Sequence, residues 1–361
     1  MFSVIALLGH RDSSTDGVQD YCEFLGRALD RRGVTLPIVR IDWAKKGWLG
    51  ALWELWHSSN AWRGNWVILH YTALAWSRRG FPVGVVAVMA ILRTRGVRCG
   101  VVFHEPHSNG GPHWLGWIRG TCQSWVIRRI YGLSDKSFFA DPLDTVRWLP
   151  KSGSKGIFIP IGANIPERSS SAVSPRKENS IKTVAIFCIT GAPHASVEIE
   201  DIAQAARSAV STNSALRFVF FGQGTIEVNE QIACAFRGIP VDISVLGLLG
   251  ADEISDVLAD SDLMLCVRGA IYSRRGSAIA GIACGLPIVC YEGPETGFPI
   301  TEAGLELVAY RDREELGRAV SRILSDDCLR EELAIRSRRA HAQYFSWERI
   351  AERFVAELVD E

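Results

Sequence analysis

Short apolar runs alternate with helical segments along almost the whole of this 361-residue chain. Residues 4–8, 67–70 and 99–103 have the length and the continuous apolar character of strands that are buried on both faces. Segments with one apolar helical face separate these runs. Strands that alternate with helices predict a parallel sheet that is covered by helices on both faces. The pattern therefore predicts an α/β fold.

A polar stretch rich in serine and proline, residues 165–180, divides this alternation into two halves. The chain is long enough, and with 47% hydrophobic residues apolar enough, for two domains with separate cores. We predict two Rossmann-like domains whose parallel sheets face each other across a crevice, the default ligand site. The predicted parts are an N-terminal domain over residues 1–165, a linker over 166–180, a C-terminal domain over 181–345, and a helix over 346–361 that packs back on the N-terminal domain.

The charge and the tryptophans are distributed unevenly between the two halves. Residues 1–160 contain 20 Lys and Arg against 11 Asp and Glu, a net charge of +9, and residues 161–361 contain 20 against 29, a net charge of −9. Eleven of the twelve tryptophans lie in the basic half. Residues 43–58 and 114–131 combine tryptophan with Lys or Arg, as interfacial helices do, although packing in a core is the alternative. We expect peripheral contact with an anionic membrane, which would suit a lipid-linked acceptor.

Targeting and redox signals indicate a cytoplasmic protein at the inner face of the cell membrane. No run reaches the roughly 18 consecutive apolar residues of a membrane span, and the N-terminus has no basic leader or cleavage site. Nine scattered cysteines without a Cys-x-x-Cys pair indicate reduced, mostly buried thiols and no zinc site. The sequence has no nucleic-acid recognition motif, so we expect no nucleic-acid partner.

One stretch, residues 268–291, has the order strand, loop, short helix and strand. Gly276 and Ser277 stand where the helix would begin, and Arg268, Arg274 and Arg275 precede it. The start of a helix has free N–H groups and a partial positive charge, so this loop is suited to a diphosphate. A solvated surface loop is the alternative.

Three stretches, residues 16–33, 159–163 and 283–289, resemble the retaining glycosyltransferases of GT-B fold, in particular the family-4 type. Residues 345–351 resemble the final helix of that family. The resemblance implies a retaining hexosyltransferase, which moves a sugar from a nucleotide-diphosphate sugar to an acceptor hydroxyl without a metal or other cofactor. It also implies that the N-terminal domain, residues 1–165, binds the acceptor and that the C-terminal domain, residues 181–345, binds the nucleotide sugar. Synthesis of cell-surface polysaccharide or glycolipid would be its setting. A non-catalytic relative that binds a nucleotide sugar or a partner enzyme is the alternative.

The sequence departs from this family at the donor site. The family usually has two glutamates, eight residues apart, where this chain has Tyr272 and Ala280. The usual basic pair after the first strand of the second domain is also not evident in residues 190–194. A leaving diphosphate still requires positive charge, so we expect the three arginines to replace that pair. The predicted donor-binding residues are Gly17, Thr190, Gly191, Gly222, Gly224, Gly247, Leu248, Arg268, Arg274, Arg275, Gly276, Ser277 and Glu295.

Acceptor-side residues are expected after a strand of the first domain, at His104, Glu105 and His107. A histidine can orient or deprotonate a hydroxyl, and a neighbouring carboxylate can fix its tautomer. We predict catalytic roles for His104, Glu105 and Asp16, and an acceptor-binding role for His107. Asp16 has the alternative role of a turn or cap residue. Two histidines three residues apart are weak evidence for a metal, so no metal site is predicted.

Overall fold

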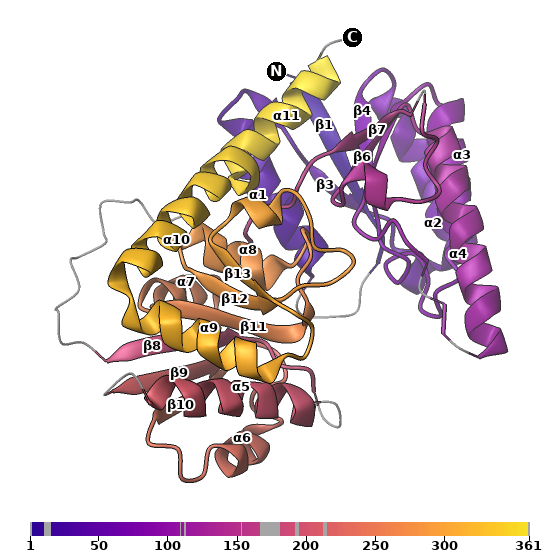
Figure 1. Cartoon of the computed structure of the whole chain (residues 1–361). Coiled ribbons are helices and arrows are strands. Elements are labelled where there is room, and N and C mark those ends of the chain that lie inside the picture. The colour runs from indigo at the N-terminus through magenta and orange to yellow at the C-terminus, as the bar shows by residue number, and fades with distance from the viewer. Residues whose placement is uncertain are drawn as a thin grey trace. The chain divides into compact units, whose positions relative to one another are not determined.

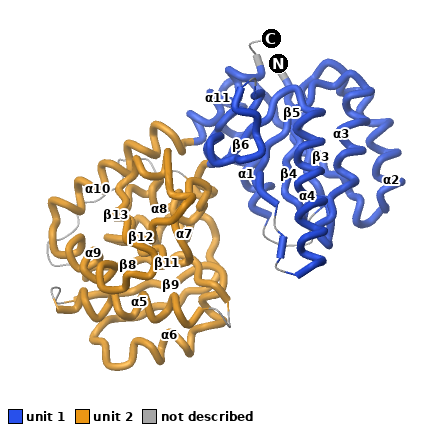
Figure 2. Tube along the Cα trace, turned by 45° about the vertical axis from the view of Figure 1, so that its right-hand side comes forward, with its two compact units in different colours: residues 1–161, 347–361 blue, residues 162–346 orange. Residues whose placement is uncertain are grey.

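The computed structural model describes residues 2–10, 16–108, 110–111, 113–152, 154–166, 181–191, 195–211 and 215–359. Contacts divide the chain into unit 1, Met1–Ile161 with Trp347–Glu361, and unit 2, Gly162–Ser346 (Figures 1 and 2). Each unit has its own parallel sheet with helices on both faces, so the predicted α/β class is confirmed. Apart from Pro166, the predicted linker lies outside the described residues.

Unit 1 contains a seven-stranded parallel sheet in the order β2-β1-β4-β5-β6-β7, with β3 also paired to β1. Successive side chains of a strand point to opposite faces. In β1, Ile5 and Leu7 therefore join one core and Ala6 joins the other. The strands are β1 (Phe2–Leu8), β2 (Val34–Thr35), β3 (Ile38–Arg40), β4 (Trp66–Tyr71), β5 (Arg98–Phe103), β6 (Lys136–Phe139) and β7 (Gly156–Phe158).

The helices of unit 1 cover the two faces of this sheet (Figure 1). One core contains α2, α3 and α4, and the other contains α1 and α11. Trp347 stacks on Phe24 of α1 with 5.8 Å between ring centroids, and Trp66 donates its indole N–H to the carbonyl oxygen of Leu358 at 3.0 Å. The final helix is thereby part of unit 1. The helices are α1 (Gly17–Asp30), α2 (Trp43–Ser58), α3 (Gly84–Thr94), α4 (Trp114–Leu133) and α11 (Trp347–Val359).

Unit 2 contains a six-stranded parallel sheet in the order β10-β9-β8-β11-β12-β13. Leu263, Leu265 and Val267 of β11 face a core with α5 and α9, whereas Met264 faces α8 on the other side. The strands are β8 (Lys182–Phe187), β9 (Leu216–Phe221), β10 (Asp242–Gly247), β11 (Leu263–Ala270), β12 (Ile288–Tyr291) and β13 (Leu305–Val308). The helices are α5 (Ala195–Val210), α6 (Asn229–Ala235), α7 (Ala251–Ala259), α8 (Gly276–Ala283), α9 (Arg313–Ser325) and α10 (Asp327–Ala340).

Several elements differ from the sequence-based expectation. The apolar run over residues 36–41 suggests one strand, but only Ile38–Arg40 forms a strand, β3. The short strand β2, Val34–Thr35, lies on the other side of Pro37, which has no N–H for a sheet ladder. Gly47 has φ +71° and kinks α2. The cysteines are less buried than expected: none of the nine, all of which are among the described residues, forms a disulfide, but only Cys22, Cys99 and Cys290 are buried. None of the helices in the described ranges has the length and hydropathy needed to cross a bilayer.

Candidate functional site

Two histidines meet at the carboxyl ends of β4 and β5 in unit 1. His70 is the penultimate residue of β4, and His104 directly follows β5, which pairs with β4 in parallel register. The Nδ1 atom of His70 lies 3.0 Å from the Nε2 atom of His104, and the stacked rings have centroids 5.3 Å apart. His70 is 1% exposed, whereas His104 is half-buried. The structure thus pairs the predicted His104 with a histidine that the sequence analysis did not single out.

Both histidines are neutral near neutral pH because burial disfavours the charged form of each imidazole ring. Burial lowers the pKa of His104 to about 4, although the charge of Asp16 acts in the opposite direction. Burial and the neighbouring His104 also lower the pKa of His70. A neutral imidazole has one N–H donor and one acceptor nitrogen, so a single N–H forms the bond between the rings.

Asp16 caps the first helix of unit 1. Its carboxylate accepts hydrogen bonds from the N–H groups of Val18 at 3.1 Å and Gln19 at 3.4 Å, and pairs with Arg40 at 2.8 Å. Burial would raise the pKa of Asp16, but the hydrogen bond and charge of Arg40 and the two backbone donors outweigh it and lower the pKa. This is the cap role that the sequence left open as the alternative. Gly17 is the first residue of α1, and a Cβ there would meet nothing within 4 Å.

Glu105 and His107 are half-buried on the segment that follows β5. Within the described ranges, no hydrogen bond or ion pair joins either side chain to His104. The expectation that a carboxylate next to His104 fixes its tautomer is therefore not met, because the imidazole of His70 occupies that position. The signal for His70 in the sequence is a polar residue at the end of an otherwise apolar buried strand, residues 67–70.

The arginine-rich loop of unit 2 connects β11 to α8. The guanidinium group of Arg275 donates from Nη2 to the carbonyl oxygens of Arg268 at 2.6 Å and Ala270 at 3.2 Å. Arg275 is also the N-cap of α8, and its side chain does not cap the helix. Gly276 is exposed, and a Cβ on it would meet nothing within 4 Å. The start of α8 is therefore exposed and has no side-chain cap. The sequence predicts a helix start of this kind for an anion site.

The three arginines of this loop do not have the same surroundings. Arg268 is an exposed residue of β11, and its carbonyl oxygen accepts from Arg275. The guanidinium groups of Arg274 and Arg275 lie 4.8 Å and 4.7 Å from the ring centroid of Tyr272, and Arg274 also pairs with Glu295 at 3.7 Å. Arg268 and Arg275 therefore lie at the carboxyl end of β11, and Glu295 partly neutralises the charge of Arg274.

The segment after β8 is held by a buried carboxylate. Glu198 is 6% exposed and accepts hydrogen bonds from the N–H of Thr190 at 2.9 Å and from its hydroxyl at 2.5 Å. Both donors of Thr190 are therefore used inside unit 2. Gly191 lies close to the Glu227 carboxylate, because a Cβ on it would be 3.0 Å from Oε2. Residues 192–194, where the family's basic pair was sought, lie outside the described residues.

Packing accounts for the glycines at the ends of β9 and β10. Gly222, Gly224 and Gly247 have φ of +88°, +84° and +73°, a region that favours glycine. A Cβ at Gly224 would lie 2.2 Å from the carbonyl oxygen of Ile189. The N–H of Gly222 donates to the carbonyl oxygen of Gly247 at 2.6 Å. These φ angles and contacts account for the three residues as structural turn glycines. Leu248, which follows Gly247, is exposed.

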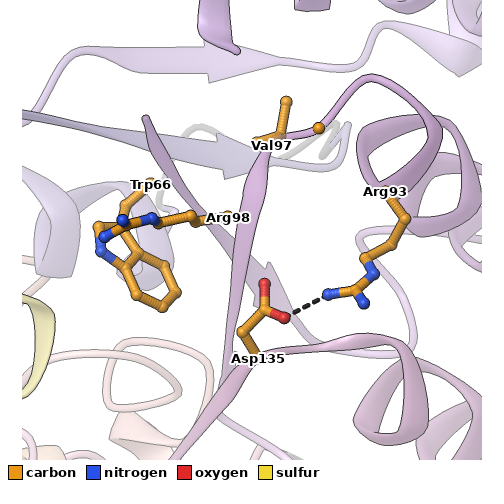
Figure 3. A pocket seen from close by; sticks show the side chains of 6 residues that line it. Trp66, Arg93, Val97, Arg98 and Asp135 are labelled. Atoms are coloured by element: carbon orange, nitrogen blue, oxygen red, sulfur yellow. Dashed lines mark hydrogen bonds and ion pairs between the residues drawn. The ribbon is translucent and has the colours of Figure 1, made fainter. Parts of the chain in front are cut away.

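A hollow of about 660 Å³ lies in unit 1, but not beside the candidate residues (Figure 3). It is at the amino ends of β4, β5 and β6, next to Trp66, Arg98 and Asp135, whereas His70 and His104 are at the carboxyl ends. Arg93 forms an ion pair with Asp135 across it. In the described ranges, no group of three or more His, Cys, Asp or Glu side chains is arranged to hold a metal ion.

Comparisons with known proteins agree with this architecture. Residues 185–326, most of unit 2, match the family model described as Glycosyl transferases group 1. A search of curated proteins finds no match.

Among solved structures, HepE from Anabaena in complex with UDP and glucose has a TM-score of 0.68 and 12% identity, with all of both chains covered. Sucrose-phosphate synthase from Thermosynechococcus elongatus has a TM-score of 0.64 and 16% identity, covering 99% of this chain and 98% of that one. A glycosyltransferase from Rickettsia africae has a TM-score of 0.66 and 12% identity, covering 100% and 99%. The chain therefore has the GT-B fold, and its second unit carries the sequence pattern of glycosyl transferases group 1.

Proposed function

We propose that this protein is a glycosyltransferase that moves a sugar from a nucleotide-diphosphate sugar to an acceptor hydroxyl. The observation that carries the proposal is the family match over residues 185–326, which contains the arginine-rich loop and the uncapped start of α8. The HepE structures with UDP and with UDP-glucose support a uridine nucleotide as the first donor to test. Retention of the anomeric configuration, and a role in cell-surface polysaccharide or glycolipid synthesis, follow from the motif resemblance.

Unit 2 would hold the diphosphate of the donor. Arg268 is exposed, its carbonyl oxygen binds the guanidinium group of Arg275, and the start of α8 has no side-chain cap. Each charge-assisted hydrogen bond to the diphosphate would contribute about 1.5–3 kcal/mol. These groups would also neutralise charge on the leaving diphosphate, where the family's usual basic pair is missing. On the side of unit 1, His104 would contact a substrate oxygen.

A donor panel tests this proposal. Thermal melting with nucleoside diphosphates should show a rise in melting temperature for the preferred base, because a ligand that binds the folded state stabilises it. Transfer and donor hydrolysis should be detectable with that nucleotide sugar, and both should fall in Arg275→Ala and in His104→Ala. Arg237→Ala changes an exposed arginine between α6 and β10 and is the matched control. Binding of a nucleotide sugar without turnover in any assay would favour the non-catalytic alternative.

We further propose that unit 1 contacts an anionic membrane through exposed aromatic and aliphatic side chains of α2, of α4 and of the segment before α3. Trp53 of α2 and Trp114 and Trp117 of α4 are 67%, 70% and 71% exposed. Aromatic side chains of this kind favour the membrane–water interface. The other large apolar side chains exposed on these helices and on the segment before α3 are Leu49, Trp56, Leu74, Phe81, Val83, Leu115, Ile118 and Trp125.

The three helices that carry these side chains pack against one another. A Cβ on Gly84, the first residue of α3, would meet the ring of Trp48 in α2. Gln123 of α4 donates to the carbonyl oxygen of Gly80 at 3.0 Å, which ties α4 to the segment before α3. Residues 43–134 contain eleven Lys and Arg against two Glu, so the charge complements acidic headgroups.

Vesicle sedimentation tests the membrane proposal. The protein should sediment with vesicles of phosphatidylglycerol and phosphatidylcholine, and much less with phosphatidylcholine alone. Replacing Trp114 and Trp117 by Ser should weaken binding at least about tenfold, because each buried aromatic ring contributes roughly 1 kcal/mol or more. Ile335→Ser changes an exposed apolar side chain of α10 in unit 2 and should have no effect. Equal sedimentation of the tryptophan variant and the wild type would refute the proposal.

A further inference from the structure

Three side chains of unit 1, Cys22, His70 and His104, form a hydrogen-bonded chain, and each of them is buried or half-buried. The Nδ1 atom of His70 lies 3.0 Å from Nε2 of His104, and the Nε2 atom of His70 lies 3.4 Å from Sγ of Cys22 on α1. Cys22 is 0% exposed. The ring of Tyr21 meets both imidazoles edge-on, with centroid distances of 5.0 Å to His104 and 5.7 Å to His70. Both nitrogen atoms of His70 are therefore occupied inside the unit, so His70 can act on a substrate only through His104.

The chain allows two arrangements of its protons. In the first, Cys22 donates its S–H to Nε2 of His70, and His70 donates its Nδ1–H to Nε2 of His104. His104 then carries its own proton on Nδ1. In the second, His104 donates its Nε2–H to His70, and His70 donates its Nε2–H to the sulfur. His104 then has an unprotonated Nδ1 atom. The first arrangement makes His104 a hydrogen-bond donor, and the second makes it a base.

The thiol distinguishes between these arrangements. Burial raises the pKa of Cys22, so the sulfur keeps its proton. A thiol is a weak donor, but an imidazole nitrogen is a good acceptor, whereas sulfur is a weak acceptor. In the second arrangement the S–H proton of Cys22 would also need another acceptor. Within the described ranges, the thiol has no second hydrogen-bond partner. The first arrangement pairs every buried donor with a suitable acceptor.

We propose that His70 is a positioning residue that holds His104 as a neutral imidazole with its proton on Nδ1, so that His104 donates a hydrogen bond to a substrate oxygen and does not act as a base. Only the last part, the substrate oxygen, rests on the proposed function. The titratable and charged side chains around His70 and His104 are consistent with a neutral His104. Asp16 is the nearby carboxylate, and Arg40 is paired with it, while Tyr21 and Cys22 of α1 are uncharged.

Nitrogen-15 NMR of histidine-labelled full-length protein tests the arrangement directly, because two-bond correlations to the ring carbon-bound protons distinguish the two tautomers. Wild type should show the Nδ1–H form for both His70 and His104, with no titration of His104 between pH 8 and pH 5.5. Cys22→Ala removes the donor to His70, so both rings should shift toward the Nε2–H form. Cys22→Ser supplies a hydroxyl donor and should restore the wild-type spectrum.

Cys99→Ala is the matched control for the loss of a thiol. Cys99 is also 0% exposed in unit 1, and its sulfur donates to the carbonyl oxygen of Val97, away from the histidines. This variant should leave both tautomers unchanged. An Nε2–H form of His104 in the wild type, or wild-type tautomers in Cys22→Ala, would overturn the proposal.

The pH profile of sugar transfer supplies a second readout. His70→Leu removes the donor to Nε2 of His104, a bond that favours the neutral ring, so the pKa of His104 should rise. The wild-type rate should not change with ionisation of His104 above about pH 5.5, whereas the His70→Leu rate should acquire a new inflection in that range, because a protonated His104 would donate to the substrate oxygen as a charged group. Unchanged profiles would contradict the positioning role. If the tautomers are as expected but no donor is bound or used, the proposed function fails and the proton arrangement stands.

Discussion

Acid should destabilise unit 1 through His104, and the size of the effect can be worked out from its surroundings. Burial lowers the pKa of His104 to about 4, while the same side chain in an unfolded chain has a pKa of about 6.5. Because the folded pKa is lowered, the unfolded state binds the proton more readily. The contribution of His104 to stability is therefore complete above about pH 6.5 and declines as the pH falls from 6.5 toward 4.

At pH 5 an unfolded His104 would be about 97% protonated and the folded side chain about 10%. The free energy of unfolding should therefore be about 2 kcal/mol lower at pH 5 than at pH 7.5 because of His104 alone. His70 acts in the same direction, since its pKa is lowered as well. Replacing His104 by Gln should reduce the difference between the two pH values by about 2 kcal/mol.

Urea unfolding followed by tryptophan fluorescence measures this difference. All twelve tryptophans belong to unit 1, so the signal reports on that unit. His113→Gln is the control, because His113 is exposed at the start of α4 and has no part in the histidine pair. It should show the pH dependence of the wild type. If His104→Gln loses as much stability as the wild type between pH 7.5 and pH 5, the account of a buried neutral pair is wrong.

Three further substitutions test the packing of unit 2 by circular dichroism and thermal unfolding. Gly224→Ala should destabilise the unit by more than about 2 kcal/mol, because the new Cβ meets the carbonyl oxygen of Ile189 at a residue with φ +84°. Gly238→Ala, with φ +81° and open space around it, should cost only about 1 kcal/mol, and equal effects would contradict this reasoning. Asp201→Ala should cost about 3 kcal/mol, because the fully buried carboxylate pairs with Arg311 and Arg313. A loss below about 1 kcal/mol would show that this network contributes little.

The sequence predicted the architecture because the architecture depends on local patterns. Apolar runs at residues 4–8, 67–70 and 99–103 became β1, β4 and β5, and residues 114–131 became α4, since strand length and helical periodicity are visible in short windows. The kink at Gly47 in α2 was not visible, because a glycine inside a helical pattern is usually tolerated. The strand β13 was missed, since four residues carry little periodic signal.

The site was predicted less completely because it depends on contacts between distant residues. The arginine-rich loop was recognised from its composition. The hydrogen bonds from Arg275 to the carbonyl oxygens of Arg268 and Ala270, which use part of its donor capacity, were not predicted. Asp16 was assigned a catalytic role, and it is a helix cap, as its position before Gly17 also allows. His70 and His104 are 34 residues apart, and only parallel pairing of β4 with β5 brings them together.

The central claim is that Arg268, Arg275 and the start of α8 hold a diphosphate in unit 2. Calorimetric titration of UDP and uridine into wild type, Arg268→Ala and the control Arg237→Ala tests it most directly. Within the described ranges, the guanidinium group of Arg268 has no hydrogen bond or ion pair to lose, so its removal should not disturb the loop. We expect Arg268→Ala to weaken UDP binding by about tenfold to a hundredfold and to leave uridine binding unchanged. Equal affinity of Arg268→Ala and wild type for UDP, or no binding of any nucleoside diphosphate, would contradict the account.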